Sequence, residues 1–195
     1  MRIIGITGGV GAGKSTVLDH LREEYDAFVI QADKVGHMVM EPGERCYDAV
    51  IDLFGEQIIK ADKTIDRKQV SDVVFAEAGK LHKLNGIIHP AVKEYILETL
   101  RRELENGRQL AVVEAALFFD DHYEEFCDEV WYIFVKEETR IQRLMKSRGY
   151  TVEKAKSIIR SQASDVFFRE HTDLVIDNNG DFYQTCLQIK KGLLQ

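Results

Sequence analysis

The sequence is poor in the features of secreted and membrane proteins. It has only two prolines and three cysteines in 195 residues, and the cysteines stand alone, without metal-ligand spacing, at Cys46, Cys127 and Cys186. We therefore expect reduced thiols rather than a disulfide framework. No apolar run approaches the ~20 residues that cross a bilayer, and glycines interrupt the N-terminus where a signal peptide would be apolar. These absences predict a cytoplasmic protein with no membrane partner.

The sequence also has fewer basic than acidic residues. Lysine and arginine number 26 against 33 aspartates and glutamates, so the formal net charge is −7. A chain with this balance lacks the basic face of a nonspecific nucleic-acid binder, which argues against nucleic acid as a partner. An anionic ligand would need a local basic pocket. Repeats, low-complexity tracts and flexible linkers are missing too, which predicts one domain over residues 1–195.

Five apolar, β-branched runs alternate with segments of helical periodicity. Continuous apolar strands indicate a five-stranded parallel sheet that helices cover on both faces, so the fold class is α/β. A helical lobe is expected over about 34–105. A helical pair over about 137–162, broken at Gly149 and restarting at Thr151, is expected to form a small lid. The five runs lie at 2–7, 27–31, 109–115, 129–135 and 173–178.

The segment GGVGAGKST (8–16) lies between the first apolar run and a helical segment. It completes the pattern G-x-x-x-x-G-K-S, which in this strand-to-helix context strongly indicates a phosphate-binding loop. Backbone N–H groups of such a loop cradle phosphate oxygens, the lysine neutralises the β and γ phosphates, and the serine hydroxyl reaches Mg²⁺. The expected nucleotide-binding residues are Gly8, Gly11, Ala12, Gly13, Lys14, Ser15 and Thr16, with Ser15 as the metal ligand.

One carboxylate stands at the end of an apolar run and another just after a run, where open α/β sheets place functional side chains. Asp33, in VIQADKV, could accept a proton from an attacking hydroxyl or hold that hydroxyl in line with the γ phosphate. A helix N-cap explains Asp33 equally well. Glu114 is a weaker candidate for the Mg²⁺ shell, because aspartate is more typical there, and it could simply cap a loop.

His89 and Pro90, in LNGIIHP, join an apolar helical segment to a second helical one, and Pro90 suits the first turn of the latter. His89 could hydrogen-bond a substrate phosphate or ribose, although a single histidine more often caps or packs. The segment DNNGD (177–181) follows the last run, and Asn178, Asn179 and Gly180 could form a turn over the nucleotide base. A plain turn is equally consistent with these residues.

The segment 136–160 supplies the missing basic pocket, with eight basic residues against three acidic ones. Arg140 and Arg143 are three positions apart and share a helix face, as a clamp on a transferring phosphoryl group requires. A solvated helix face would show the same pattern. A mobile lid that carries these arginines would also exclude water, which competes with the acceptor for the γ phosphate.

With these positions assembled, the chain resembles the dephospho-CoA kinase family over almost its full length. The shared features occur in family order as GITGGVGAGKST, ADKVGHMVMEPG, LNGIIHPAV, ALFFD, a basic segment ending in RSQAS, and TDLVIDNNG. The phosphate loop belongs to a very large superfamily, but AD running into EPG and the pattern LNxxxHP are far more specific. The resemblance implies a P-loop nucleotide-kinase-like fold and ATP-dependent phosphorylation of the ribose 3′-hydroxyl of dephospho-CoA, with Mg²⁺.

The resemblance also implies roles for single residues. Asp33 would be the base or hydroxyl-positioning residue, and Lys14, Arg140 and Arg143 would complete the catalytic set. Substrate contacts would come from Asp33, His37 and His89, a nucleotide contact from Asn178, and Gln162 matches the glutamine that closes the second lid helix. The chain departs from the usual family pattern at Gln31, His37, Ala116, Asp120 and Phe168, where the family commonly has aspartate, arginine, proline, glutamate and a basic residue.

Two other functions fit part of the pattern. Another small-molecule or nucleotide kinase would share the fold, the loop and the lid arginines, but LNGIIHP favours the dephospho-CoA branch. A GTP-dependent switch would need a guanine-reading Asn-Lys-x-Asp, and DNNGD lacks the lysine. The sequence does not predict the oligomeric state.

Overall fold

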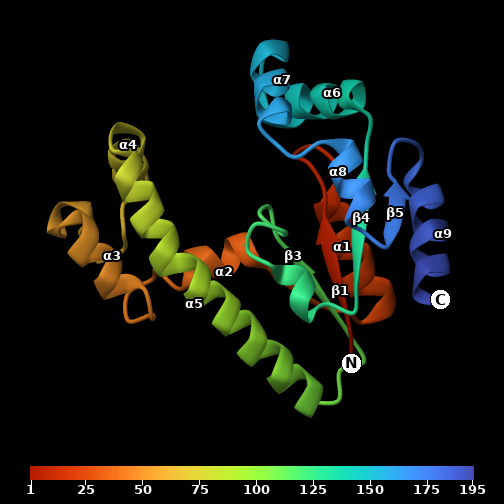
Figure 1. Ribbon diagram of the computed structural model, residues 1–195, viewed down its shortest axis with the longest axis horizontal. Helices are drawn as coiled ribbons and strands as arrows, with labels where there is room; N and C mark the ends of the chain where they lie inside the picture. The colour runs from red at the N-terminus through yellow and green to blue at the C-terminus, as the bar shows by residue number, and fades with distance from the viewer. The chain divides into compact units, whose positions relative to one another are not determined.

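The computed structural model describes residues 1–195, apart from the side chains of Phe75 and Ala78. It divides into two compact units, Met1–Ile30 with Glu103–Gln195, and Gln31–Arg102. In chain order the elements are β1 (Arg2–Thr7), α1 (Lys14–Tyr25), β2 (Phe28–Gln31), α2 (Ala32–Met38), α3 (Tyr47–Phe54), α4 (Arg67–Ala76), α5 (Ala78–Glu105), β3 (Leu110–Glu114), β4 (Glu129–Phe134), α6 (Glu137–Arg148), α7 (Val152–Arg160), α8 (Asp165–Glu170), β5 (Leu174–Asp177) and α9 (Phe182–Leu193) (Figure 1).

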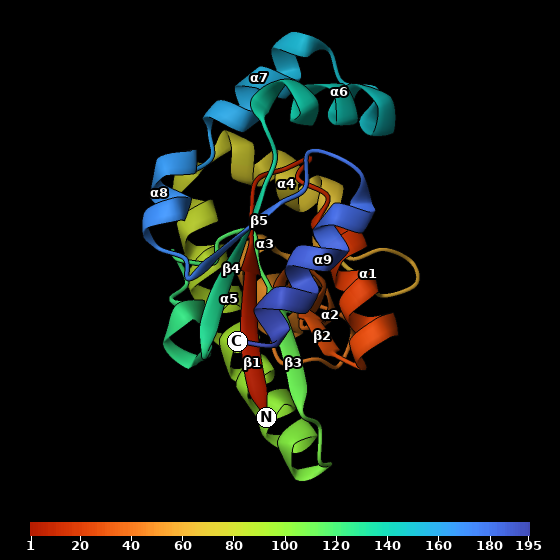
Figure 2. The same ribbon diagram turned by 90° about the vertical axis from the view of Figure 1, so that its right-hand side faces the viewer.

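All five predicted strands form, and they make one sheet in the order β2-β3-β1-β4-β5. β1 pairs in parallel with β3 and with β4, and β4 pairs in parallel with β5. The predicted α/β fold class with a five-stranded parallel sheet is confirmed. Because parallel strands end at the same edge, the segments that follow β1, β3, β4 and β5 gather there. Figure 2 shows α6 and α7 beyond this edge, at the end of the unit opposite the N-terminus.

Alternation along the central strands sorts side chains between the two faces of the sheet. Ile4 and Ile6 of β1 and Trp131 of β4 are fully buried in one cluster with the apolar faces of α1 and α9. On β4 the next residue, Tyr132, stacks on Phe168 of α8 with ring centroids 4.8 Å apart. Since burying a large apolar side chain contributes about 1.5–3 kcal/mol, this two-sided burial accounts for the continuous apolar strands in the sequence.

The second unit is helical, as the sequence predicts. The loop before α3 is tied to α5 through Arg45, whose guanidinium donates to Glu94 at 3.1 Å and to Glu98 at 2.9 Å. Burial raises the pKa of the neighbouring Cys46 thiol, while Arg45 opposes that shift. All three cysteines are free, and none of the helices that the structure describes is both long and apolar enough to cross a membrane.

The prediction that Pro90 starts a new helix is wrong. Helix α5 runs from Ala78 to Glu105 with Pro90 inside it. A proline cannot donate to the carbonyl four residues earlier, here that of Gly86, and usually bends or ends a helix. Gly86 is exposed, and Ile88 and Val92 on either side of the proline both lie beside Gly36 of α2. Packing on both sides of Pro90 keeps the helix in one piece.

The predicted helical pair is confirmed in its detail. Helix α6 ends at Arg148, and Gly149 takes the left-handed conformation, with φ of +63°, that commonly closes a helix. Thr151 is the N-cap of α7, and its side chain accepts from the N–H of Lys154 at 3.2 Å.

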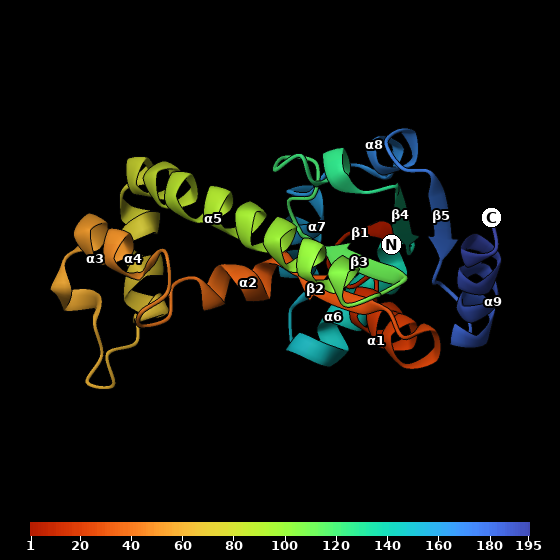
Figure 3. The same ribbon diagram turned by 90° about the horizontal axis from the view of Figure 1, so that it is seen from below.

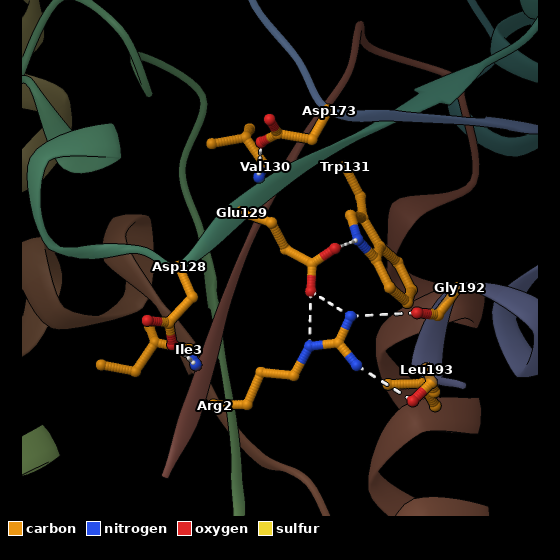
Figure 4. A network of polar contacts seen from close by, with 9 residues as sticks. All are labelled: Arg2, Ile3, Asp128, Glu129, Val130, Trp131, Asp173, Gly192 and Leu193. Atoms are coloured by element: carbon orange, nitrogen blue, oxygen red, sulfur yellow. Dashed lines mark hydrogen bonds and ion pairs between the residues drawn. The ribbon is translucent and has the colours of Figure 1, made fainter. Parts of the chain in front are cut away.

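Arg2 ties the C-terminal helix to the sheet (Figure 4). Its guanidinium donates to the carbonyl of Gly192 at 2.9 Å and to that of Leu193 at 3.0 Å, and it forms an ion pair with Glu129. Glu129 also accepts from Nε1 of Trp131 at 2.8 Å. The last carbonyls of a helix have no donors within the helix, so Arg2 satisfies groups that α9 cannot satisfy itself. Figure 3 shows α9 beside β5, with which it makes contacts.

We predict that Arg2→Gln lowers the free energy of unfolding by about 1–3 kcal/mol, because it removes charge-assisted bonds that are partly buried. Urea unfolding measures the change. Arg22→Gln is the matched control, since Arg22 pairs with the exposed Asp19 on α1, and a loss under about 0.5 kcal/mol is expected there. Equal losses in the two variants would contradict the anchoring role of Arg2.

Candidate active site

The predicted phosphate loop joins the first strand to the first helix, since β1 ends at Thr7 and α1 begins at Lys14. Gly11 and Gly13 have φ of +80° and +83°, which L side chains rarely adopt. A Cβ on Gly13 would also stand 2.7 Å from Nδ2 of Asn178, so this position requires glycine for space as well as for conformation. A loop wound in this way gathers N–H groups at a helix start, where the helix dipole favours an anion.

The side chain of Lys14 lies back along the loop. Its Nζ donates to the carbonyl of Gly8 at 2.8 Å and lies 3.4 Å from a carboxylate oxygen of Glu114. Glu114 is the last residue of β3 and is only 7% exposed. The buried Glu114 carboxylate therefore has the Lys14 ammonium group beside it as a countercharge. The residue that the sequence offered as a weaker candidate for the Mg²⁺ shell is thus in contact with the lysine of the loop.

Arg140 and Gln162 hold the tip of the loop. Nε of Arg140 donates to the carbonyl of Val10 at 2.8 Å, and its Nη2 donates to Oε1 of Gln162 at 2.5 Å. The same Gln162 oxygen accepts from the N–H of Val10 at 3.0 Å. Both polar groups of the Val10 backbone are therefore bound. Burial lowers the pKa of Arg140, but a guanidinium keeps its charge in a protein.

Arg143 and Asn178 converge on the carbonyl of Ala12. Asn178 donates to it from Nδ2 at 2.8 Å, and Arg143 donates from Nη1 at 3.2 Å. Nη2 of Arg143 donates to the backbone carbonyl of Asn178 at 2.8 Å. Both arginines share one face of α6 and contact the loop, so a merely solvated helix face is ruled out. The side-chain amide of Asn178 is hydrogen-bonded to the Ala12 carbonyl and to the Thr185 hydroxyl. Its predicted contact with the nucleotide stays a prediction.

The oxygen donors near the loop suit Mg²⁺. Ser15 is the second residue of α1 and is exposed, and the Glu114 carboxylate lies beside Lys14. In the part of the chain that the structure describes, no cluster of three His, Cys, Asp or Glu side chains could hold a metal. Mg²⁺ usually takes one or two protein oxygens and completes its shell with water and substrate phosphates. One hydroxyl and one carboxylate fit that pattern.

The predicted acceptor-side residues all lie in the second unit. Asp33 is in the first turn of α2 and is exposed, but the N-cap of that helix is Gln31, so the N-cap explanation of Asp33 is wrong. His37 follows four positions later, which puts both side chains on one exposed face of the helix. His89 is half-buried within α5. Roles for these residues stay predictions.

Two polar residues of α9 that the motifs did not single out, Thr185 and Gln188, bind the turn after β5. Thr185 donates to Oδ1 of Asn178 at 2.9 Å, and Gln188 binds both backbone groups of Asp177 at 2.9 Å. The available signal was their spacing. They are three positions apart, on the side of an amphipathic helix that also carries the buried Ile189.

The parallel sheet, the phosphate loop and the arginines that bind it define a kinase of the P-loop, nucleotide-kinase-like class. The chain belongs to the dephospho-CoA kinase family, whose model matches residues 2–184.

Individual relatives agree with this assignment. A dephospho-CoA kinase of Oceanobacillus iheyensis is 35% identical over 191 residues, which cover 98% of this chain and 96% of the relative. A solved protein of Thermus thermophilus has a TM-score of 0.84 and 27% identity, with 99% of this chain and 96% of that chain covered. A solved dephospho-CoA kinase of Campylobacter jejuni has a TM-score of 0.72 and 23% identity, with 100% and 96% covered, which supports the fold.

We predict that Gly9→Ala lowers kinase turnover about 10- to 100-fold with the fold intact, because small displacements of a positioned group have effects of that size. A Cβ on Gly9 would stand 2.1 Å from Nη2 of Arg140, so the guanidinium would have to leave its place on the loop. Steady-state kinetics measures the change. Gly79→Ala, where a Cβ meets none of the atoms that the structure describes within 4 Å, is the control and should keep its turnover. Unchanged turnover in Gly9→Ala would contradict the role given to Arg140.

Proposed function

We propose that this protein transfers the γ-phosphoryl group of ATP to the ribose 3′-hydroxyl of dephospho-CoA, which gives coenzyme A and ADP. The observation that carries the proposal is the family match over residues 2–184, which includes both the phosphate loop and the LNGIIHP segment (84–90). The contacts around the loop support the donor half of the reaction. The acceptor half rests on residues of the second unit.

On the donor side, we assign the ATP phosphates to the N–H groups of the loop and to Lys14. Lys14 would give its charge to the β and γ phosphates, and it is held close to the loop by the Gly8 carbonyl and Glu114. Mg²⁺, bound by the Ser15 hydroxyl and by oxygens of the nucleotide, would neutralise charge on the phosphates. Ser15 and Thr16 are both exposed at the start of α1.

On the acceptor side, we assign Asp33 the part of base. Its carboxylate would take the proton of the 3′-hydroxyl as that oxygen bonds to the γ phosphorus and the bond from phosphorus to the ADP oxygen breaks. Asp33 comes two residues after the end of β2, and the loop follows β1, so both occupy the position after a strand that open α/β sheets use for function. His37 and His89 would contact the substrate.

Arg140 and Arg143 would stabilise the transferring phosphoryl group. Each guanidinium has five N–H donors, and the bonds to the carbonyls of Val10, Ala12 and Asn178 use part of that set. The remaining donors sit on a charged group that is already fixed against the loop, and preorganised charge of this kind lowers the barrier to phosphoryl transfer. We also propose that helices α6 and α7 act as a lid that keeps water from the γ phosphate.

Two further assignments concern the cellular compartment of the protein and its domain organisation. We assign the protein to the cytoplasm, because its three cysteines are free, and burial raises the pKa of the Cys127 thiol to about 12, which leaves it unreactive. We treat residues 34–105 as the substrate lobe of one kinase domain.

The direct test of the function compares acceptors. With ATP and Mg²⁺, we expect rapid phosphorylation of dephospho-CoA and little of AMP, dTMP or small hydroxyl compounds, measured as ADP release and as product by mass spectrometry. Brisk turnover of another acceptor without turnover of dephospho-CoA would contradict the proposal. Tight, guanine-specific binding without any transfer would instead support a nucleotide switch.

We predict that Asp33→Asn lowers kcat about 100-fold or more, because the amide cannot accept the hydroxyl proton and general-base catalysis contributes on that scale. Nucleotide affinity, measured by calorimetry with ADP, should change little. Asp48→Asn is the matched control, as Asp48 is also an exposed aspartate in the first turn of a helix of the same unit. Near-wild-type kcat in Asp33→Asn would remove this residue from the mechanism.

A further inference from the structure

The turn after β5 is held by side chains of α9. Gln188 accepts from the N–H of Asp177 and donates to its carbonyl, both at 2.9 Å, so one amide binds both polar groups of that residue. Three positions earlier, the hydroxyl of Thr185 lies 2.9 Å from Oδ1 of Asn178 and 3.3 Å from the carbonyl of Asp177. Thr185 is 1% exposed, so solvent cannot replace its hydroxyl as the donor.

The orientation of the Asn178 side-chain amide determines whether a hydrogen-bond donor or an acceptor faces the phosphate loop. With Oδ1 on the Thr185 hydroxyl, Nδ2 points to the carbonyl of Ala12 at 2.8 Å. A carbonyl can only accept, so a flipped amide would place two oxygens against each other. Asn178 is 4% exposed, and a Cβ on Gly13 would meet its Nδ2 at 2.7 Å, so the loop packs directly on this amide.

We propose that Thr185 is a positioning residue of the nucleotide site, which acts through Asn178 to hold the Ala12 carbonyl and the loop in the phosphate-binding conformation. The inference rests on the proposed function and extends it to α9. Thr185 lies just beyond residue 184, where the match to the family model ends. The chain of contacts runs from the helix to the loop in two hydrogen bonds, from Thr185 to Asn178 and from Asn178 to Ala12.

The backbone of the turn after β5 is also held by hydrogen bonds that do not involve Thr185. Asp177 caps the N–H of Asn179 at 2.9 Å, and Oδ1 of Asn179 accepts from the N–H of Lys136 at 2.8 Å, just before α6. The backbone N–H of Asn178 donates to the carbonyl of Phe134 at 2.9 Å. Loss of the Thr185 hydroxyl therefore leaves the backbone of the turn in place and releases mainly the amide of Asn178.

The test compares Thr185→Val, which keeps the shape and removes the hydroxyl, with Thr185→Ser, which keeps the hydroxyl. ADP binding is measured by calorimetry, and KM for ATP and for dephospho-CoA by steady-state kinetics. We expect Thr185→Val to weaken ADP binding and raise KM for ATP about tenfold, the effect of one lost buried hydrogen bond, with KM for dephospho-CoA unchanged. Thr185→Ser should restore ADP binding to within about threefold of wild type. Thr185→Ala gives the same comparison if Thr185→Val does not fold.

Arg2→Gln separates positioning from general stability, because Arg2 binds the opposite end of α9, at the carbonyls of Gly192 and Leu193 (Figure 4). We expect it to lower stability and leave ADP binding unchanged. Wild-type ADP binding in Thr185→Val, or equal weakening in Arg2→Gln, would overturn the inference. ADP binding requires no acceptor substrate, so it tests the positioning role separately from the reaction. If the wild-type protein does not phosphorylate dephospho-CoA while Thr185→Val weakens ADP binding, the proposed function is contradicted and the positioning role is supported.

Discussion

The carbonyl oxygen of Ala12 is the point on which the candidate site depends. It accepts from Nδ2 of Asn178 and from Nη1 of Arg143, so the turn after β5 and helix α6 meet at one atom of the phosphate loop. Two residues earlier, the Val10 carbonyl accepts from Arg140 in the same way. Carbonyls on the outside of the loop are held by cationic and amide donors. The loop is therefore shaped from outside by elements far away in sequence.

This arrangement gives Arg140 and Arg143 a structural role besides the clamp that we propose from their spacing. Arg140 and Arg143 are bound to the loop through its carbonyls, so the position of α6 and the shape of the loop are coupled. The glycines follow from the same contacts. Gly9 leaves room for the Arg140 guanidinium and Gly13 leaves room for the Asn178 amide. A side chain at either position would separate the loop from the groups that hold it.

Much of the fold could be predicted from the sequence, because strands buried on both faces and helices with an apolar stripe leave a periodic signal. All five strands form, and Gly149 and Thr151 end and begin helices as expected. The prediction that Pro90 starts a helix is wrong because packing on both sides of the proline overrides its local tendency to interrupt a helix. The loop was predictable from its motif. Thr185 left only a spacing signal on α9, because its hydrogen bond joins segments that the sequence alone does not bring together.

One departure from the pattern that the resemblance implies has a structural explanation. Phe168, where the resemblance implies a basic residue, is 8% exposed and stacks on Tyr132, so it belongs to the core. Burial of Tyr132 itself, with the nearby Asp165 carboxylate, raises the pKa of its phenol to about 12, so the phenol stays neutral. Gln31 precedes α2 as its N-cap and makes no side-chain capping bond there, so the structure does not explain its replacement of an aspartate. Neither change touches the contacts that hold the loop.

The central claim is that the loop is held by its carbonyls and by the N–H of Val10, while the N–H groups at the start of α1 are left for phosphate. A crystal structure of the protein with ADP and Mg²⁺ tests it most directly. We expect β-phosphate oxygens to accept from N–H groups at the start of α1, with Nδ2 of Asn178 still within hydrogen-bond distance of the Ala12 carbonyl. An Asn178 amide that has left Ala12 to bind the nucleotide would contradict the claim.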